Sequence, residues 1–204
     1  MRSLALLSLA FVSLAALARP AAAQAVVGQK APAFTATDTE GRTRSLSEFQ
    51  GKVVVLEWWN PQCPFVGKHY GSGHMQKLQK EWTGRGVVWL TIDSSAPGEQ
   101  GNVDAAQADA LMKQRGASPT ALLLDPDGTM GRAYGAKTTP HMFVIDTTGT
   151  VVYAGGIDDK PSTDREDIAT AHNFVEAALT EVTSGRKVST ATSRPYGCSV
   201  KYKS

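Results

Sequence analysis

Cysteine is scarce in this chain of 204 residues, which contains only Cys63 and Cys198. Two cysteines can form no more than one intramolecular disulfide, so the chain is not a small scaffold in which several disulfides replace a hydrophobic core. About 180 residues remain after loss of the N-terminal segment described next, and that length is enough for one domain with an ordinary core.

Long apolar runs are also lacking, apart from Leu4–Leu17, which is too short for the ~20 apolar residues of a membrane-spanning helix. Arg2 precedes this stretch and the small-residue sequence ARPAAAQA follows it, which is the pattern of a secretory signal peptide. Cleavage after Ala23 and cleavage after Ala25 fit equally well, and the absence of cysteine there excludes lipid attachment. We therefore expect residues 1–25 to be removed on export to an oxidising compartment, the periplasm, with no membrane insertion of the mature chain.

An excess of positive charge is missing as well. The chain has 21 Lys and Arg against 19 Asp and Glu, and removal of the signal peptide takes away Arg2 and Arg19, which brings the net charge close to zero. Because no basic arm or stripe remains, we expect no nucleic-acid partner.

Strand-like and helix-like segments alternate along the rest of the chain. Runs of β-branched and aromatic residues predict buried strands, and apolar residues at helical spacing predict helices. The predicted elements are a β-hairpin at 31–46, strands at 53–59, 87–93, 121–125, 141–146 and 150–156, helices at 63–82, 102–116 and 162–184, and a helical turn at 127–135. This order predicts an α/β fold with a central mixed β-sheet flanked by helices, an N-terminal β-hairpin and an inserted strand-helix unit. We expect one domain at 26–186, followed by a polar tail at 187–204 that carries Cys198.

Cys63 stands where a predicted buried strand gives way to a predicted helix, in the sequence WWNPQCPFV. In such sheets the working site usually lies at the carboxyl ends of the strands. A helix N-terminus offers unpaired N–H groups and a partial positive charge, which both favour a thiolate, and Pro64 suits the first helical position. Because the thiolate is the reactive form of cysteine, we expect Cys63 to be reactive, with a lowered pKa, and not a buried structural residue.

Two segments resemble the thioredoxin superfamily. VVVLEWWNPQCPFV, residues 53–66, resembles its strand, active-site turn and helix start, and KTTPHMFVID, residues 137–146, resembles its strand with a cis-proline, here Pro140. With the hairpin and the extra strand, the chain is similar over roughly residues 27–185 to peroxiredoxin-like redoxins (the alkyl hydroperoxide reductase and thiol-specific antioxidant group) and to TlpA-type periplasmic proteins.

The resemblance implies roles for several residues. Cys63 would be the nucleophile, and Thr139 and Pro140 would form a loop that faces it and holds an extended substrate by main-chain contacts. Glu57 falls six residues before Cys63, where thioredoxins have a buried acid that moves protons during exchange. A carboxylate there would act as a general base with a raised pKa, or would simply be a strand residue bonded to a neighbour.

Two departures from the family patterns bear on the reaction. Val66 stands where the thioredoxin motif has its second cysteine, so there is no adjacent resolving thiol. Asn60 stands where a peroxiredoxin is expected to have threonine, although its amide still offers hydrogen-bond donors. A peroxiredoxin would also hold the peroxide with an arginine, for which Arg132 is the nearest candidate.

The second cysteine, Cys198, lies in the tail sequence YGCSVKY, where Tyr196, Val200 and Tyr202 suggest that the tail docks on the domain. By thiol–disulfide exchange it would pair with Cys63 and act as the resolving residue that the CPFV motif lacks. An unpaired cysteine on a loose tail is the other interpretation.

The histidines allow a third interpretation, because cysteine and histidine together suit copper or zinc. His141 follows Pro140, and a set of Cys63, Cys198 and His141 would resemble the ligands of the Sco copper chaperones, although their paired cysteines are absent. The other histidines are expected at the surface of helices: His69, His74 and His172.

Three functions therefore remain as hypotheses. In the first, an exported peroxiredoxin-like antioxidant enzyme, Cys63 attacks a peroxide, becomes a sulfenic acid and is resolved by Cys198 or by an external thiol reductant. The second is thiol–disulfide exchange with a partner protein through a mixed disulfide at Cys63, which Asn60 in place of threonine favours. The third is a non-enzymatic copper or thiol chaperone. The two enzymatic hypotheses require no cofactor.

Overall fold

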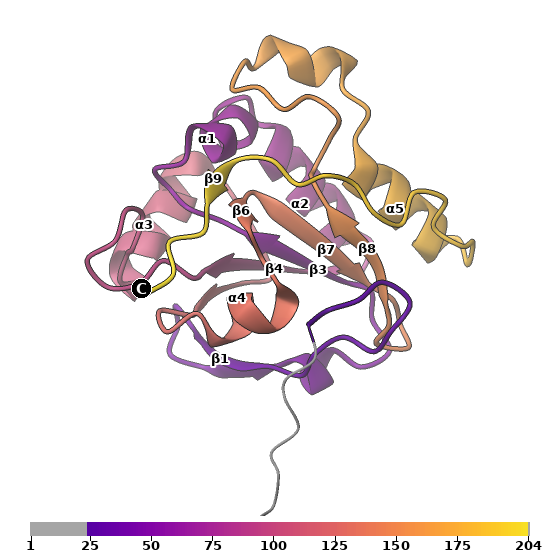
Figure 1. Ribbon diagram of the computed structural model, residues 1–204, viewed down its shortest axis with the longest axis horizontal. Coiled ribbons are helices and arrows are strands. Elements are labelled where there is room, and N and C mark those ends of the chain that lie inside the picture. The colour runs from indigo at the N-terminus through magenta and orange to yellow at the C-terminus, as the bar shows by residue number, and fades with distance from the viewer. Residues whose placement is uncertain (1–23, 204) are drawn as a thin grey trace, which may run out of the picture.

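The computed structural model describes residues 24–203, which form a seven-stranded β-sheet with helices on both faces (Figure 1). The predicted signal peptide lies outside the described residues except for Gln24 and Ala25. None of the helices in the described range is both long and apolar enough to cross a bilayer.

The strands of the main sheet lie in the order β2-β1-β5-β4-β3-β7-β8. The central strands β5, β4 and β3 run parallel, and the other neighbours pair antiparallel. The strands span Thr35–Asp38 (β1), Thr43–Ser45 (β2), Val54–Trp58 (β3), Val88–Asp93 (β4), Ala121–Leu124 (β5), His141–Ile145 (β7) and Val151–Gly155 (β8). The predicted α/β fold with a mixed sheet is confirmed, and so are the N-terminal hairpin and the inserted strand, which is β5.

In residues 24–203, α1, α2, α3 and α5 cover one face of the sheet, and α4 covers the other. The α-helices span Pro64–Gly71 (α1), His74–Gly84 (α2), Ala105–Arg115 (α3), Thr129–Tyr134 (α4) and Phe174–Thr183 (α5), and short 3-10 helices lie at Leu46–Phe49 (η1) and Glu166–Thr170 (η2). The sheet therefore has no face open to solvent along its central strands, as the continuous apolar character of those strands predicts.

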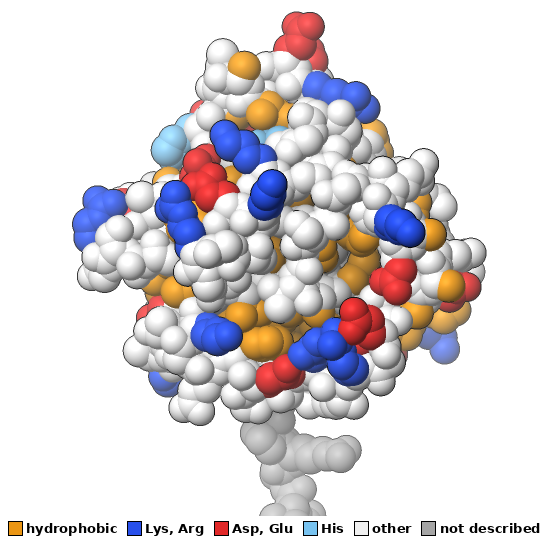
Figure 2. Space-filling view, turned by 180° about the vertical axis from the view of Figure 1, so that it is seen from behind, with side chains coloured by type: hydrophobic (Ala, Val, Ile, Leu, Met, Phe, Trp, Pro, Cys, Tyr) orange, Lys and Arg blue, Asp and Glu red, His pale blue; other side chains and the backbone are white. Residues whose placement is uncertain are grey.

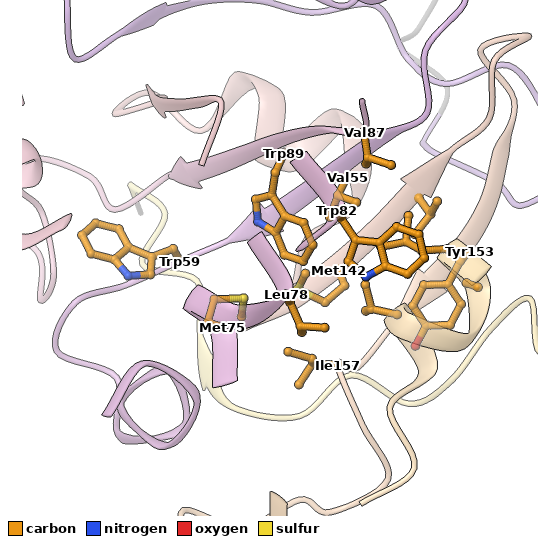
Figure 3. Close-up of a cluster of buried hydrophobic side chains, with 14 of the residues drawn as sticks. Val55, Trp59, Met75, Leu78, Trp82, Val87, Trp89, Met142, Tyr153 and Ile157 are labelled. Carbon is orange, nitrogen blue, oxygen red and sulfur yellow. The ribbon is translucent and has the colours of Figure 1, made fainter. Parts of the chain in front are cut away.

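Alternate residues of each central strand enter two separate apolar clusters, because successive side chains of a strand point to opposite faces. Val55 and Trp89 enter the cluster beneath α2 and α5 (Figure 3). Their neighbours Leu56 and Leu90 enter the cluster beneath α4. The register of the sheet is thus fixed by burial on both faces.

Two helices are shorter than the sequence pattern predicts. The predicted helix at 63–82 is divided into α1 and α2 at Gly73, whose φ of 77° is left-handed and interrupts a right-handed helix. The predicted helix at 162–184 begins as an α-helix only at Phe174, where the side chain of Asn173 accepts a hydrogen bond from the Glu176 N–H and caps α5.

The C-terminal tail docks across the end of the sheet (Figure 1, yellow), as Tyr196, Val200 and Tyr202 led us to expect. Its Cys198–Ser199 segment, β9, pairs antiparallel with β6 (Thr138–Thr139) in a separate two-stranded sheet. The side chain of Val200 is buried in the core beneath α4.

Glycine residues of the domain make room for the tail. A Cβ at Gly155 would collide with the backbone of Ser193, and one at Gly131 would collide with the ring of Tyr202. The hydroxyl of Tyr202 donates a hydrogen bond to the carbonyl of Ala136 at 2.8 Å. The tail is therefore packed at both of its ends as an integral part of the structure.

Charged side chains of both signs are interspersed over the face that Figure 2 shows. On this face the described residues form no broad basic surface of the kind that holds a nucleic-acid backbone.

We expect Gly155→Ala to lower the free energy of unfolding by about 1–3 kcal/mol, because the new methyl group has to displace the tail at Ser193. Gly84→Ala is the matched control, since a Cβ at that helical position meets nothing within 4 Å and the change should be neutral or gain up to ~1 kcal/mol. Chemical denaturation measures both, and equal stabilities of the two variants would show that the tail is not packed in this way.

Candidate functional site

Cys63 is the N-cap of α1, four residues beyond the buried Trp59 that follows β3, and Pro64 takes the first helical position as predicted. Its backbone N–H donates to the Asn60 carbonyl at 3.1 Å, which closes the turn between strand and helix. The residue is only 2% exposed. The sequence therefore placed Cys63 correctly at a helix N-terminus, where backbone N–H groups and the helix dipole favour a thiolate.

The loop with the predicted cis-proline faces this cysteine. The Thr139–Pro140 peptide bond is cis, and both residues are buried. The thiol of Cys63 donates a hydrogen bond to the Thr139 carbonyl oxygen at 3.0 Å. The two segments that resemble the thioredoxin superfamily thus meet in the fold, 76 residues apart in sequence.

The tail brings the second cysteine to the same place. In the pairing of β6 with β9, Cys198 lies directly opposite Thr139. Gly197 allows this approach, because its φ is 137° and any side chain there would collide with the Thr139 carbonyl. Cys198 is half-buried, and both cysteines are free thiols in this structure.

The two thiols have opposite acidities. Burial raises the pKa of the Cys63 thiol, but the adjacent side chain of Cys198 and the contact with Thr139 outweigh it, with help from the backbone N–H of Val66. The net pKa of Cys63 therefore lies below its ordinary value. Burial and the adjacent Cys63 raise the pKa of Cys198 to about 12. Cys63 is thus the more acidic thiol of the pair.

Glu57 lies on β3 and is completely buried. Its carboxyl group accepts hydrogen bonds from four side chains, at 2.8–3.3 Å: Tyr70, Gln79, Trp89 and Thr91. Burial raises the pKa of Glu57 even though all four donors lower it. Both sequence-based interpretations, a bonded strand residue and an acid with a raised pKa, describe this side chain, and its part in proton transfer stays a prediction.

The side chains of Asn60 and Arg132 are both engaged in contacts with other residues than Cys63. The Asn60 amide donates to the Gln100 carbonyl at 2.9 Å and its oxygen accepts from the Gln62 N–H at 2.8 Å, so Asn60 ties the turn before Cys63 to the loop after β4. Arg132 is exposed; it stacks on Tyr202 and donates to the tail carbonyl of Lys203 at 2.8 Å. Its contacts serve the tail and not Cys63.

Sequence reasoning missed Arg115, the last residue of α3. Its guanidinium donates to the Pro61 carbonyl at 2.9 Å and lies over the rings of Trp59 and Tyr70. These contacts hold the turn that precedes Cys63. An arginine at a helix C-terminus gives no sequence signal that separates this role from an ordinary surface position.

A buried polar cluster behind Cys63 was also missed. His69 is fully buried, so the expectation that it is a surface residue was wrong, and it lies 2.9 Å from the half-buried His74 between ring nitrogens. Lys68 is 1% exposed, and its Nζ lies 3.6 Å from the Asp158 carboxylate. Tyr196 of the tail donates its hydroxyl to the same carboxylate. The cluster is buried because the tail and the 158–173 segment, both distant in sequence, close over α1. Desolvation accordingly lowers the pKa of His69 to about 3.

The conceivable metal set does not come together. His141 is buried with a pKa lowered by desolvation to about 4, and its Nδ1 accepts from the Lys137 N–H at 3.2 Å. Across residues 24–203 no group of three or more His, Cys, Asp or Glu side chains is arranged to hold a metal ion. Cys63 and Cys198 therefore lack the third ligand that the copper hypothesis drew from His141. His172 is exposed, as expected, but it precedes α5 and does not lie on it.

The family model described as "AhpC/TSA family" matches residues 27–154, a stretch that contains Cys63 and Pro140. The chain belongs to the AhpC/TSA family. The match ends before the tail, so Cys198 lies outside the segment that the family shares.

Individual relatives of this redoxin represent two chemistries. The chain is 29% identical over 126 residues to thiol-disulfide oxidoreductase ResA of Bacillus thuringiensis subsp. konkukian, with 62% of this chain and 67% of the relative covered. It is 31% identical over 117 residues to a protein of Coxiella burnetii described as a peroxiredoxin (bcp), with 57% and 71% covered.

A solved structure of a hypothetical protein from Sinorhizobium meliloti 1021 superposes with a TM-score of 0.72 at 24% identity, covering 88% of this chain and 96% of that one. This likeness concerns the fold alone. The protein is thus a redoxin with a thioredoxin-like fold, as the resemblance implied.

Cys198→Ala should raise the pKa of Cys63, because the side chain of Cys198 is the main hydrogen-bond partner that lowers it. The pH dependence of Cys63 alkylation by iodoacetamide measures this pKa. Ser199→Ala, an exposed neighbour, is the control and should leave the titration unchanged. A Cys63 titration that does not move in Cys198→Ala would contradict the contact between the two thiols.

Glu57→Gln should destabilise the protein most at low pH. The folded-state pKa of Glu57 is raised above 4.5, so the folded protein binds the carboxyl proton of Glu57 more tightly than the unfolded chain does. The stability that this proton contributes is present at low pH and is lost as the pH rises from about 4.5 through the raised pKa. Gln cannot accept at both atoms, which leaves a buried donor unpaired at a cost of about 1–3 kcal/mol. The difference in unfolding free energy between wild type and variant should therefore shrink as pH rises. A difference that stays constant across the titration would refute the raised pKa.

Proposed function

We propose that the protein is a thiol–disulfide oxidoreductase whose redox couple is formed by Cys63 and Cys198. The observation that carries this proposal is the β6–β9 pairing, which sets Cys198 opposite Thr139, the residue whose carbonyl accepts the Cys63 thiol. The second cysteine of a thioredoxin motif is supplied by the tail instead of by position 66. The relationship to ResA supports exchange chemistry.

In the proposed reaction the Cys63 thiolate attacks one sulfur of a substrate disulfide and expels the other as a thiolate, which leaves a mixed disulfide on Cys63. Cys198 then loses its proton and attacks the Cys63 sulfur, and the substrate leaves as a dithiol. The charge of Cys63, which contributes to the raised pKa of Cys198, is gone in the mixed disulfide. Cys198 thus becomes easier to ionise at the step that needs it.

Peroxide reduction is the second candidate, supported by the family match and by the Coxiella relative. Here Cys63 would attack the peroxide and become a sulfenic acid, which Cys198 would convert to the same disulfide with release of water. Asn60 and Arg132 weigh against this candidate, because the hydrogen bonds of their side chains go to Gln100, Gln62 and Lys203 and none goes to the Cys63 thiol.

The cellular setting of the proposal comes from the sequence. We propose that residues 1–25 direct export to the periplasm, that 26–186 form the redoxin domain, and that the tail at 187–204 completes its site. An oxidising compartment supplies disulfide substrates for the couple and an external thiol to regenerate it.

Scrambled-disulfide refolding with the reduced protein tests the proposal. Wild type should reduce one substrate disulfide per molecule and accumulate a Cys63–Cys198 disulfide. Cys63→Ser should be inactive, and Cys198→Ser should stall as a mixed disulfide on Cys63, because no second thiol resolves it. Ser199→Ala controls for disturbance of β9.

Two results would change the assignment. Wild-type turnover by Cys198→Ser would remove Cys198 from the couple. No exchange at all by wild type, beside rapid consumption of hydrogen peroxide that requires Cys63, would replace exchange by the peroxidase reaction.

A further inference from the structure

An open groove of about 610 Å³ lies beside the tail, next to the cysteine pair. We call it the tail groove; its lining residues are Thr138, Asp158, Asp159, Pro161, Phe174, Ser193, Arg194, Pro195, Tyr196 and Gly197. One wall belongs to the segment between β8 and α5, and the other belongs to the tail. Two of the lining residues, Thr138 and Gly197, immediately precede Thr139 and Cys198 in the chain.

The tail groove has the character of a peptide-binding surface. Proline and aromatic surfaces contribute on both walls, from Pro161 and Phe174 on one side and from Pro195 and Tyr196 on the other. The tail wall is held firmly, since the Tyr196 hydroxyl donates to the buried Asp158 and its ring packs edge-on against Phe65. Aromatic residues with few rotatable bonds are enriched where polypeptides bind.

Exposed charges of opposite sign flank the apolar walls. Asp159 is exposed on the wall next to α5, and Arg194 is exposed on the tail. In an extended peptide that has a basic residue beside an apolar residue, the basic residue would pair with Asp159 and the apolar residue would pack between the apolar walls. Arg194 would repel any further positive charge on the tail side of the groove.

Of the two cysteines in the couple, Cys198 is the more exposed. Cys63 is 2% exposed and lies beneath β9, whereas Cys198 is half-buried and follows the groove residue Gly197. An incoming thiol that approaches along the tail groove therefore meets Cys198 before Cys63, and attack on Cys198 breaks the disulfide and releases Cys63.

We propose that the tail groove binds an extended, thiol-bearing polypeptide that regenerates the couple by attacking Cys198. This inference rests on the proposed Cys63–Cys198 disulfide. The partner thiolate forms a disulfide bond with the Cys198 sulfur, the Cys63–Cys198 bond breaks, and Cys63 leaves as a thiolate. A second thiol of the same partner then attacks the partner sulfur, which gives a partner disulfide and a Cys198 thiolate that takes a proton from water. The couple gains two electrons and the partner dithiol loses two.

Adduct mapping tests the site of attack. The purified full chain, oxidised to the Cys63–Cys198 disulfide, is mixed with a synthetic pentapeptide that has one cysteine beside a phenylalanine and a lysine. The mixture is quenched early with iodoacetamide, and peptide mass mapping locates the adduct. We expect the peptide on Cys198 and the alkyl group on Cys63. A peptide adduct on Cys63 at the earliest times would overturn the inference.

Groove variants test the binding surface. Phe174→Ala should slow the reaction with the pentapeptide about tenfold, the loss expected of one apolar anchor. Arg194→Glu changes only an exposed side chain. It should speed the reaction of the oxidised protein with the basic peptide and slow its reaction with an acidic one. Arg186→Glu, the same exposed charge reversal outside the groove, is the matched control and should change neither rate.

The small thiol N-acetylcysteine distinguishes a polypeptide site from simple access to sulfur. All groove variants should react with it at the wild-type rate. Equal slowing with both thiols, or no effect of any groove variant, would overturn the tail groove as a docking site. Failure of the proposed function is recognised separately, because no Cys63–Cys198 disulfide would then form in the starting protein.

Discussion

The arrangement of the two cysteines depends on one carbonyl oxygen, that of Thr139. It accepts the hydrogen bond of the Cys63 thiol, and the same oxygen leaves room for the tail only because residue 197 is glycine. The strand pairing that follows puts Cys198 beside Cys63 although 135 residues separate them in sequence. Since the β6–β9 pairing is made by main-chain atoms, the position of Cys198 opposite Thr139 is set by the fold and little by side-chain choice. A thioredoxin motif achieves the same proximity with two cysteines in one helical turn; here a separate strand supplies the second.

Much of this arrangement could be read from the sequence because its signals are local. The apolar run at β3, the proline after Cys63 and the segment around Pro140 each carry their structural meaning within a few residues. The length of helices was harder to predict, since a helical pattern of apolar residues continues through Gly73 while the backbone does not. Local pattern therefore located Cys63 at a helix N-terminus and the loop that faces it, and overestimated the length of the helix that starts there.

The remaining features depend on contacts that no local pattern encodes. Lys68 and His69 are on a helix and look like surface residues, but Tyr196 and Asp158 close over them from distant segments. Arg132 matched the charge expected at a peroxide site and instead stacks on the tail. In each case the residue type alone suggested an environment for a polar side chain, whereas the contacts of that side chain depend on the position of the tail.

The position of the tail also constrains the proposed exchange. β9 pairs with β6 and covers Cys63, which is 2% exposed, so direct contact between Cys63 and a polypeptide disulfide would require the tail to lift. Lifting would break the bond between Tyr196 and Asp158, at a cost of about 1–3 kcal/mol for the buried hydrogen bond alone, and would expose the apolar surface under Val200. The pairing that covers Cys63 is also the one that places Cys198 opposite Thr139, so under the proposal a tail that re-forms β9 would return the second thiol to the first.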